Sequence, residues 1–397
     1  MQAGCDAFDG RRERALRFIM ALNKHPNAKV YVHSKPFEFE TPYLGKPELI
    51  PVLELGYETW GDPRHPAVLV CHALSGNTHA TDLEYPDDPK RSWWSAMVGP
   101  GRPIDTDRYF VLCVNMLGGC GGTSGPASVN PDTGESYGMH FPVVTIGDMV
   151  RSQKILLDHL GIKRLHAVIG GSMGGYQALV WAIQHPDLVD HCVSLGSGPY
   201  SNQFQIMTNR AQIDAIQLDA NFANGRYKPG HEPVNGLTIA REIGFCTFIS
   251  PLMMEKKFAK YYASPREPYT DASFHMQRLH DGEEYLRHQA WPFGRDFDAN
   301  SMIYLLQTWN HFDLAVKCGS LARAFEPVRA RTMVVAATGD NLFPPYLSEH
   351  IAAALKETGK HVRFELIDDD YGHDFFLIPE IVQEKVASLL KDFLAHS

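Results

Sequence analysis

The sequence contains no long hydrophobic run and no dense cluster of basic residues. Its apolar runs, such as Ala67–Cys71 and Met333–Ala337, fall far short of the roughly 20 residues that span a bilayer. Acidic residues outnumber basic ones, 46 against 37, which gives a formal net charge of −9. Because a phosphate backbone is held by clustered lysine and arginine, we expect neither a nucleic-acid nor a membrane partner.

Paired cysteines are also missing. The seven cysteines form an odd set without any C-x-x-C spacing, which argues against a disulfide or zinc framework and predicts reduced thiols in a cytoplasmic protein. Cys71 and Cys113 lie in apolar runs, where cysteine behaves as a small hydrophobic residue. The N-terminal arginines precede no apolar stretch, so a secretory signal is not expected. We therefore expect no metal site and a cytoplasmic location.

The composition is that of a globular protein, with 44% hydrophobic and 21% charged residues. From Pro51 onward, short runs rich in Val, Ile, Leu and Cys alternate with helical stretches. Such runs are typical of strands buried on both faces of a mostly parallel sheet. The predicted strands are 53–58, 67–72, 109–115, 165–169, 192–195, 332–337 and 362–367, and the predicted helices are 146–160, 174–185, 345–355 and 378–395.

Two segments depart from this α/β alternation. Residues 1–45 lack strong periodicity and are predicted to be a peripheral N-terminal lead-in. Residues 204–323 contain expected helices at 209–218, 234–243 and 301–317 but few buried strands. A helical insertion in an α/β fold is most simply a lid over the carboxyl ends of the strands. At roughly 150 residues per domain the length would suggest two or three domains. The predicted organisation is instead one α/β core, residues 46–203 and 324–397, split by a helical cap, residues 204–323.

The strongest local motif is the segment Gly170–Gly175, which follows a predicted strand and precedes a predicted helix. It satisfies G-x-S-x-G, in which a strained strand-to-helix turn presents a nucleophile. We predict that Ser172 is this nucleophile. The same turn would aim the Met173 N–H at a developing oxyanion. Because Gly and Ser are common in turns, the strand–turn–helix context gives the motif its weight.

A serine nucleophile needs a base, and the base needs an orienting carboxylate. Asp340 follows the predicted strand 332–337, and His373 follows the predicted strand 362–367, in the order that such folds use. Asp340 could instead cap a turn, and His373 is one of 19 histidines. Three residues in the correct order at successive strand ends favour a catalytic triad of Ser172, Asp340 and His373.

The second oxyanion donor should come from the loop after an early strand, and we assign it to the Leu74 backbone N–H. His72 and His79 lie in the same loop and are interpreted as structural rather than catalytic. The glycine-rich stretch 115–126 has no Walker lysine or dinucleotide fingerprint, so it is interpreted as a loop bordering the site.

With these motifs in place, the chain resembles the homoserine O-acyltransferase family, which has the α/β-hydrolase fold. The resemblance covers most of the chain and rests on more specific segments than G-x-S-x-G. These are 56–61, 71–76, 93–94, 99–101, 125–128 and 170–175, then 236–244 and 297–301 in the cap, and finally 372–374.

The resemblance implies a ping-pong reaction without a resident cofactor, in which acetyl-CoA is a co-substrate. Ser172 would take the acetyl group and pass it to the hydroxyl of L-homoserine, a step of methionine biosynthesis. By the family pattern, Arg241 would bind the carboxylate of the amino-acid acceptor and Asp374 its ammonium group. A zwitterion needs one fixed cation and one fixed anion, which agrees with this assignment. The family also implies a homodimer.

The cap departs from the family pattern at residues 209–213 and 244–248, which leaves the acceptor open. Related enzymes with the same triad use serine, a cephalosporin precursor, or water on small acetate esters. Succinyl-using relatives tend to carry an arginine soon after the triad aspartate, whereas this chain has Asn341, Leu342 and Phe343. Acetyl-CoA is therefore the expected donor, with an esterase, a serine O-acetyltransferase or a homoserine O-succinyltransferase as alternatives.

Overall fold

A computed structural model describes residues 28–41, 45–83, 92–258 and 280–395, and these parts are built around an eight-stranded sheet. The strand order is β1-β4-β6-β5-β7-β8-β9-β10. β1 and β4 are antiparallel to their neighbours, and the other strands pair in parallel. The strands are β1 (Lys29–His33), β4 (Leu53–Trp60), β5 (Ala67–Cys71), β6 (Phe110–Val114), β7 (Leu165–Gly171), β8 (Val189–Leu195), β9 (Arg331–Ala337) and β10 (Val362–Ile367). The seven predicted strands and the mostly parallel α/β architecture are confirmed.

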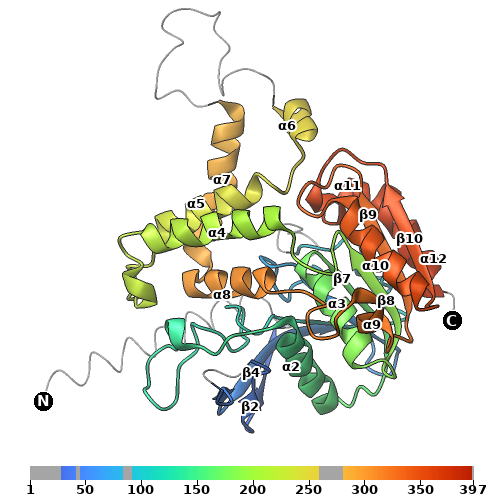
Figure 1. Ribbon diagram of the computed structural model, residues 1–397, viewed down its shortest axis with the longest axis horizontal. Helices are drawn as coiled ribbons and strands as arrows, with labels where there is room; N and C mark the ends of the chain where they lie inside the picture. The colour runs from blue at the N-terminus through green and yellow to red at the C-terminus, as the bar shows by residue number, and fades with distance from the viewer. Residues whose placement is uncertain (1–27, 42–44, 84–91, 259–279, 396–397) are drawn as a thin grey trace, which may run out of the picture.

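Helices cover both faces of the sheet, as Figure 1 shows. The faces are set by the alternation of side chains along each buried strand. In β5, Leu69 and Cys71 join one apolar cluster with side chains of α2, α3 and α10. Val68 and Val70 join a second cluster with side chains of α12 on the opposite face. The helices are α2 (Ile146–His159), α3 (Met173–Gln184), α10 (Pro345–Glu357) and α12 (Ala387–Ala395).

The predicted helix 378–395 is divided in the structure into three consecutive pieces. These are α11 (Pro379–Ile381), the π-helical turn η5 (Val382–Val386) and α12. Val382, Val386 and Leu390 are nevertheless all buried in the same apolar cluster. The apolar spacing therefore predicts the packing correctly although the backbone hydrogen bonding changes along the segment.

Between β8 and β9 the chain forms a group of helices, which Figure 1 shows to one side of the sheet. They are α4 (Gln203–Leu218), the short η2 (Ala223–Gly225), α5 (Val234–Phe245), α6 (Pro251–Lys257), α7 (Asp281–Asp296) and α8 (Ala299–Asn310), and the small α9 (Leu321–Phe325) then leads back to the sheet. We refer to α4–α8 as the cap helices. α6 and α7 were not predicted.

The two ends of the cap helices are joined to each other by backbone hydrogen bonds. The Ser201 N–H donates to the Phe312 carbonyl at 3.0 Å, and the Leu314 N–H donates to the Pro199 carbonyl at 3.0 Å. These bonds explain why α8 ends at Asn310 rather than continuing to 317 as predicted, because residues 312–314 pair with an extended segment instead of forming helical bonds. The insertion thus leaves and re-enters the core at one point.

The expected N-terminal lead-in, residues 1–45, contributes strands from Lys29 onward. β1 is an edge strand of the main sheet, and β2 (Phe37–Glu38) pairs with β3 (Leu49–Ile50) in a second, two-stranded sheet. The sequence pattern that would predict β1 is weak, because Val30 and Val32 are exposed and this strand has no alternation of buried and exposed side chains. Residues 1–27 and 42–44 lie outside the described parts of the chain.

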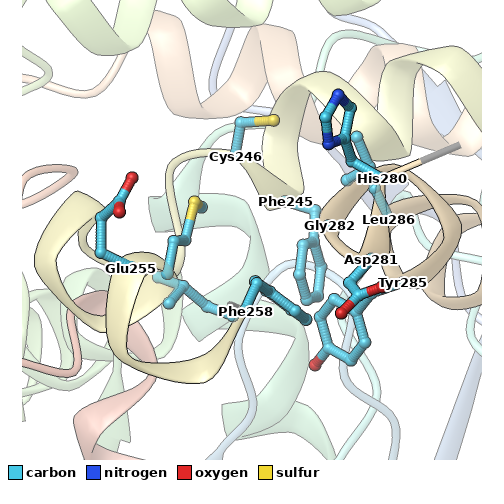
Figure 2. A pocket seen from close by; sticks show the side chains of 11 residues that line it. Phe245, Cys246, Glu255, Phe258, His280, Asp281, Gly282, Tyr285 and Leu286 are labelled. Carbon is cyan, nitrogen blue, oxygen red and sulfur yellow. The ribbon is translucent and has the colours of Figure 1, made fainter. Parts of the chain in front are cut away.

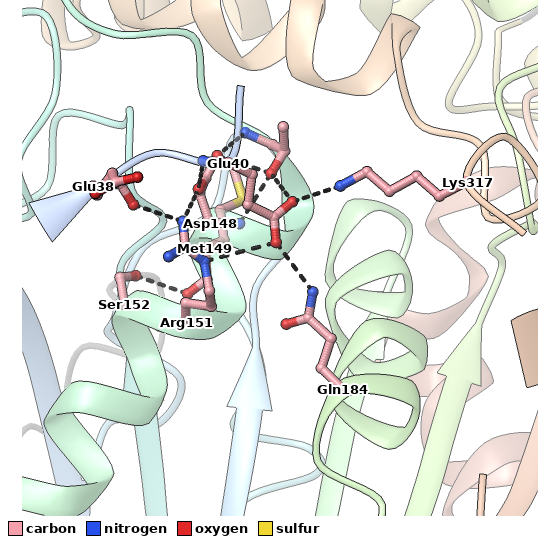
Figure 3. Close-up of polar contacts among 9 residues, drawn as sticks. Glu38, Glu40, Asp148, Met149, Arg151, Ser152, Gln184 and Lys317 are labelled. Atoms are coloured by element: carbon pink, nitrogen blue, oxygen red, sulfur yellow. Dashed lines mark hydrogen bonds and ion pairs between the residues drawn. The ribbon is translucent and has the colours of Figure 1, made fainter. Parts of the chain in front are cut away.

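Polar contacts fasten this N-terminal region to the core, as Figure 3 shows. The Glu40 carboxylate accepts a hydrogen bond from Lys317 Nζ at 3.0 Å and lies 3.7 Å from Arg151 Nε. Its backbone N–H donates to Asp148 at the start of α2 at 2.9 Å. Burial alone would raise the pKa of Glu40, but Lys317 together with Arg151 and Thr145 outweighs this effect and lowers the pKa. Glu40 therefore links three separate segments of the chain.

Among the described residues, no helix is both long and apolar enough to span a bilayer.

Candidate active site

Ser172 occupies the sharp turn between β7 and α3. Its backbone has φ 55° and ψ −125°, a conformation that side-chain-bearing residues rarely adopt, and its side chain is buried. A strained backbone of this kind persists only where the surroundings hold it and is characteristic of functional sites. Because β7 ends at Gly171 and α3 begins at Met173, the serine lies directly at the helix N-terminus.

The glycines around Ser172 are required by close backbone packing. A Cβ atom on Gly170 would lie 2.2 Å from the Gly174 carbonyl oxygen. One on Gly174 would lie 2.1 Å from the Cys71 carbonyl oxygen at the end of β5. No side chain fits at either position, which gives the G-x-S-x-G spacing its physical reason. The same packing brings the loop that follows β5 against the start of α3.

Asp340 and His373 form a buried hydrogen-bonded pair after the two following strands, β9 and β10. The His373 Nδ1–H donates to Asp340 Oδ2 at 2.8 Å. The other oxygen, Oδ1, accepts backbone N–H bonds from Leu342 at 3.0 Å and Phe343 at 2.7 Å. The carboxylate is therefore held on both sides. Burial alone would lower the pKa of His373, but the adjacent Asp340 carboxylate outweighs it and raises the pKa above its ordinary value of 6.5.

Aromatic side chains connect the His373 loop with the Ser172 turn. The Phe376 ring makes an edge-to-face contact with the His373 ring, at 5.6 Å between centroids. The same Phe376 ring fills the space beside Gly171, where a Cβ atom would lie 2.3 Å from it. β7, β8, β9 and β10 are consecutive in the sheet, so their carboxyl ends lie along one edge. The three predicted triad residues are thus gathered at that edge.

The loop after β5 contains a tight turn from Ala73 to Gly76, closed by a 2.8 Å bond from the Gly76 N–H to the Ala73 carbonyl. Leu74 is the second residue of this turn, and its N–H does not take part in the closing bond. Met173 is the first residue of α3, where an N–H has no acceptor within the helix. The structure therefore places both predicted oxyanion donors on segments that the Gly174–Cys71 contact holds together.

His72 has a structural role, as predicted. Its Nε2 accepts a hydrogen bond from the Met116 N–H at 3.2 Å, so the proton is on Nδ1, which donates to the Ala73 carbonyl at 2.8 Å. Burial lowers the pKa of His72 to about 4. A neutral histidine therefore connects the turn to the glycine-rich stretch 115–126, which lies beside this loop as expected.

His79 also belongs to the supporting structure. Its Nδ1 lies 2.9 Å from Glu58 Oε2, and both side chains are fully buried. Thr78 Oγ1 donates to the other Glu58 oxygen at 2.6 Å. This pair joins the loop after β5 to β4 and leaves His373 as the histidine paired with the predicted triad aspartate.

Arg241, on cap helix α5, extends into the same region. Its Nη1 donates to Ser75 Oγ, in the turn after β5, at 3.0 Å. The guanidinium lies between the rings of Phe248 and Phe293, with its carbon 5.0 Å and 4.8 Å from their centroids. Burial lowers the pKa of Arg241, and the nearby charge of Asp374 opposes that shift. Sequence reasoning identified Arg241 but missed the three residues around it.

Asp374 follows His373 directly, and its N–H donates to the Phe248 carbonyl at 3.3 Å. Burial raises the pKa of Asp374 above its ordinary value, although the charges of His373 and Arg241 oppose the shift. The charges of Arg241 and Asp374 therefore act on each other, and Asp374 adjoins the histidine that is paired with Asp340.

A mostly apolar cavity of about 290 Å³ opens between α5, α6 and the start of α7, and Figure 2 shows the side chains around it. None of the predicted catalytic or substrate-binding residues lines it. Ile249, one of its lining residues, pairs with Gly372 in an isolated bridge. The cavity thus adjoins the histidine loop from the cap side and is separate from the triad.

Comparison with known proteins gives the fold and the family of the chain. The family model described as alpha/beta hydrolase fold matches residues 66–379. A homoserine O-acetyltransferase of Methanohalobium evestigatum is 41% identical over 90% of this chain and 74% of its own length. One of Geobacter sulfurreducens is 42% identical over 92% of this chain and 98% of its own.

Solved structures of a transferase and of an esterase share the fold. The homoserine O-acetyltransferase from Bacillus anthracis matches with a TM-score of 0.82 at 28% identity, covering 93% of this chain and 98% of that one. Esterase E22 matches with a TM-score of 0.78 at 29% identity, covering 92% and 100%. Because the sequence match extends over nearly the whole chain and the fold agrees, the chain belongs to the homoserine O-acetyltransferase family within the alpha/beta hydrolase fold.

Proposed function

We propose that this protein transfers an acetyl group from acetyl-CoA to the side-chain hydroxyl of L-homoserine. The observation that carries the proposal is Arg241. Within the described parts of the chain it has no ion pair within 4 Å, and its buried Nε has no hydrogen-bond partner. A partly buried guanidinium with no carboxylate in direct contact is costly unless a ligand supplies one. The acceptor's carboxylate would bind there, and its ammonium group would bind Asp374.

The first half-reaction would acylate Ser172. His373 takes the proton from Ser172 Oγ while this oxygen attacks the thioester carbonyl carbon of acetyl-CoA. The N–H groups of Leu74 and Met173 stabilise the resulting oxyanion. The carbon–sulfur bond then breaks, and His373 returns the proton to the leaving CoA sulfur. The 2.8 Å bond to Asp340 keeps the Nδ1–H in place, so that Nε2 is free to act as the base.

The second half-reaction would transfer the acetyl group to the acceptor. Arg241 and Asp374 hold homoserine by its two charged groups, which leaves its hydroxyl directed toward the acyl-serine. His373 removes the hydroxyl proton, the oxygen attacks the ester carbon, and Ser172 leaves with the proton. No resident cofactor is needed, because the side chains supply the nucleophile, the base and the charge stabilisation. The product is an activated homoserine ester, as methionine biosynthesis requires.

The test is release of CoA thiol from acetyl-CoA with and without L-homoserine. Acceleration by homoserine supports the proposal, and an unchanged rate contradicts it. A panel of homoserine, L-serine and water against acetyl-CoA and succinyl-CoA separates the other transferases. Serine is one methylene shorter than homoserine, a difference worth only about 1–3 kcal/mol of discrimination. The ratio of kcat/KM values must therefore be measured rather than a single rate.

The second candidate is an acetyl-ester hydrolase, since esterase E22 shares the fold at 29% identity. For a hydrolase the acyl-enzyme would react with water at the same rate whether or not an amino acid is present. p-Nitrophenyl acetate acylates either enzyme and releases a coloured phenolate. The effect of homoserine on the steady-state rate with this substrate therefore decides between the two functions.

We also propose that the protein is a cytoplasmic homodimer. Along α4 the apolar side chains of Phe204, Met207 and Leu218 are 51%, 70% and 84% exposed. Their spacing places them along one side of the helix, where a second copy would cover them. Light scattering should give a molar mass of twice the 44.5 kDa chain mass, and the substitution Met207→Glu should lower this molar mass toward that of one chain.

The cytoplasmic location is supported by the cysteines. The thiols of Cys71 and Cys192 are buried and free, which suits a reducing compartment.

A further inference from the structure

The contact between Ser75 and Arg241 joins the core to the cap. Ser75 lies in the turn that follows β5, and Arg241 lies 166 residues later on α5. The contact is a hydrogen bond from Arg241 Nη1 to Ser75 Oγ at 3.0 Å, and within the described chain it is the one hydrogen bond of this guanidinium. The guanidinium also lies over the faces of Phe248 and Phe293.

Aromatic faces attract a guanidinium but do not fix its rotation in its own plane. A hydrogen bond to one Nη does, because the guanidinium is flat and rigid and its other N–H groups then point in defined directions. The Nε of Arg241 has no hydrogen-bond partner among the described residues, and together with Nη2 it forms the edge of the guanidinium that a carboxylate can bind bidentately. Arg241 without Ser75 would keep its charge and its stacking but lose this orientation.

Ser75 is also adjacent to Leu74, the predicted oxyanion donor, within the turn Ala73–Gly76. This turn is anchored to the core, since its N–H to carbonyl bond closes it and His72, just before it, is bonded on both ring nitrogens. The Ser75 hydroxyl therefore fixes the position of the Arg241 guanidinium relative to the core and not only relative to the cap helices.

We propose that Ser75 is a positioning residue for the acceptor half-reaction, which sets the orientation of Arg241 relative to the oxyanion turn. The inference rests on the proposed function. It makes Ser75 important for binding the amino-acid carboxylate and unimportant for acylation of Ser172 by the donor, because acetyl-CoA need not contact Arg241.

The experiment compares Ser75→Ala, Ser75→Thr and the unmodified protein in the two half-reactions. Acylation is followed by stopped-flow release of p-nitrophenolate from p-nitrophenyl acetate, and transfer by the dependence of CoA release on homoserine concentration. Ser75→Ala should raise the KM for homoserine about tenfold, the effect of losing one hydrogen bond to a charged group. Its acylation rate should stay within about twofold of the unmodified protein. Ser75→Thr retains a hydroxyl and should restore most of the KM.

The matched control is Ser128→Ala, which removes a hydroxyl that accepts a bond from the Gly125 N–H at 3.0 Å and does not contact Arg241. It should leave the KM for homoserine unchanged. If Ser75→Ala slows acylation as much as transfer, the hydroxyl shapes the oxyanion turn and the inference is wrong. It is also wrong if Ser75→Ala leaves both half-reactions unchanged while homoserine accelerates the unmodified protein. If homoserine does not accelerate the unmodified protein, the proposed function itself fails.

Discussion

The substitution Asp340→Asn tests the geometry of the site most sharply. Asparagine has the shape of aspartate, but one of its two terminal atoms is an NH2 group that donates instead of accepting. Asp340 Oδ1 accepts two backbone N–H bonds, from Leu342 at 3.0 Å and Phe343 at 2.7 Å. An NH2 group at that position would face two donors. The asparagine oxygen must therefore stay there, and the NH2 group must face His373 Nδ1.

The consequence is a change of tautomer in His373. Facing a donor, Nδ1 becomes an acceptor and the ring proton moves to Nε2, the nitrogen that has to receive the proton of Ser172 Oγ. The loss of the carboxylate charge also removes the main influence that raises the pKa of His373. A wrong tautomer in a serine–histidine–aspartate triad lowers kcat by about 10⁴-fold. We expect a loss of that size in the acylation rate.

The assay is the pre-steady-state burst of p-nitrophenolate from p-nitrophenyl acetate, with the melting temperature measured in parallel. The control is Asp368→Asn, an exposed carboxylate bonded to Thr338 Oγ1 at 3.3 Å in the same region. It removes one negative charge without touching His373 and should keep its full burst rate. If Asp340→Asn is folded and retains more than about a tenth of the acylation rate, the bond at Nδ1 does not orient the base and the reasoning fails.

Three further predictions follow from the same geometry. Because the base must be neutral and the pKa of His373 is raised, kcat/KM should fall with decreasing pH at a midpoint above 6.5, and a midpoint at or below this value in a pH–rate profile would contradict the assignment. Asp374→Asn should raise the KM for homoserine about 10- to 100-fold and increase the fraction of acetyl groups lost to water, measured as acetate against O-acetyl ester; an unchanged partition would exclude the ammonium contact. Lys317→Ala should destabilise the protein by about 0.5 kcal/mol in urea unfolding. Because the pKa of Glu40 is lowered, the full destabilisation should be measured at neutral pH and should disappear as the pH falls below 4.5. A destabilisation that is independent of pH would rule out the ion pair as its cause.

The parallel strands and the triad could be predicted from the sequence because their signals are local. A buried parallel strand such as β5 is apolar at every position, so the run is visible without any knowledge of its neighbours. Ser172 is marked by glycines that the turn itself requires. Asp340 and His373 each follow such a strand directly, and the parallel sheet brings their strand ends together.

Features that depend on distant contacts could not be predicted in this way. β1 carries two exposed valines and is a strand only because β4 pairs with it. The end of α8 is set by bonds between residues 312–314 and 199–201, which no local pattern indicates. The surroundings of Arg241 come from the turn after β5, the end of α5 and α7, and are assembled only by the folded chain.

The paired ends of the cap helices have a consequence for how this protein can change. Since Ser201 bonds to Phe312 and Leu314 to Pro199, the segment between them begins and ends at one place beside the sheet. A segment attached in this manner can be lengthened or trimmed without shifting the register of β8 or β9. Its length is therefore free to change, but its inner surface is not, because Ser75 and Asp374 of the core contact Arg241 and Phe248 of the cap. A cap grafted from a relative should function only if these contact residues are exchanged together with it.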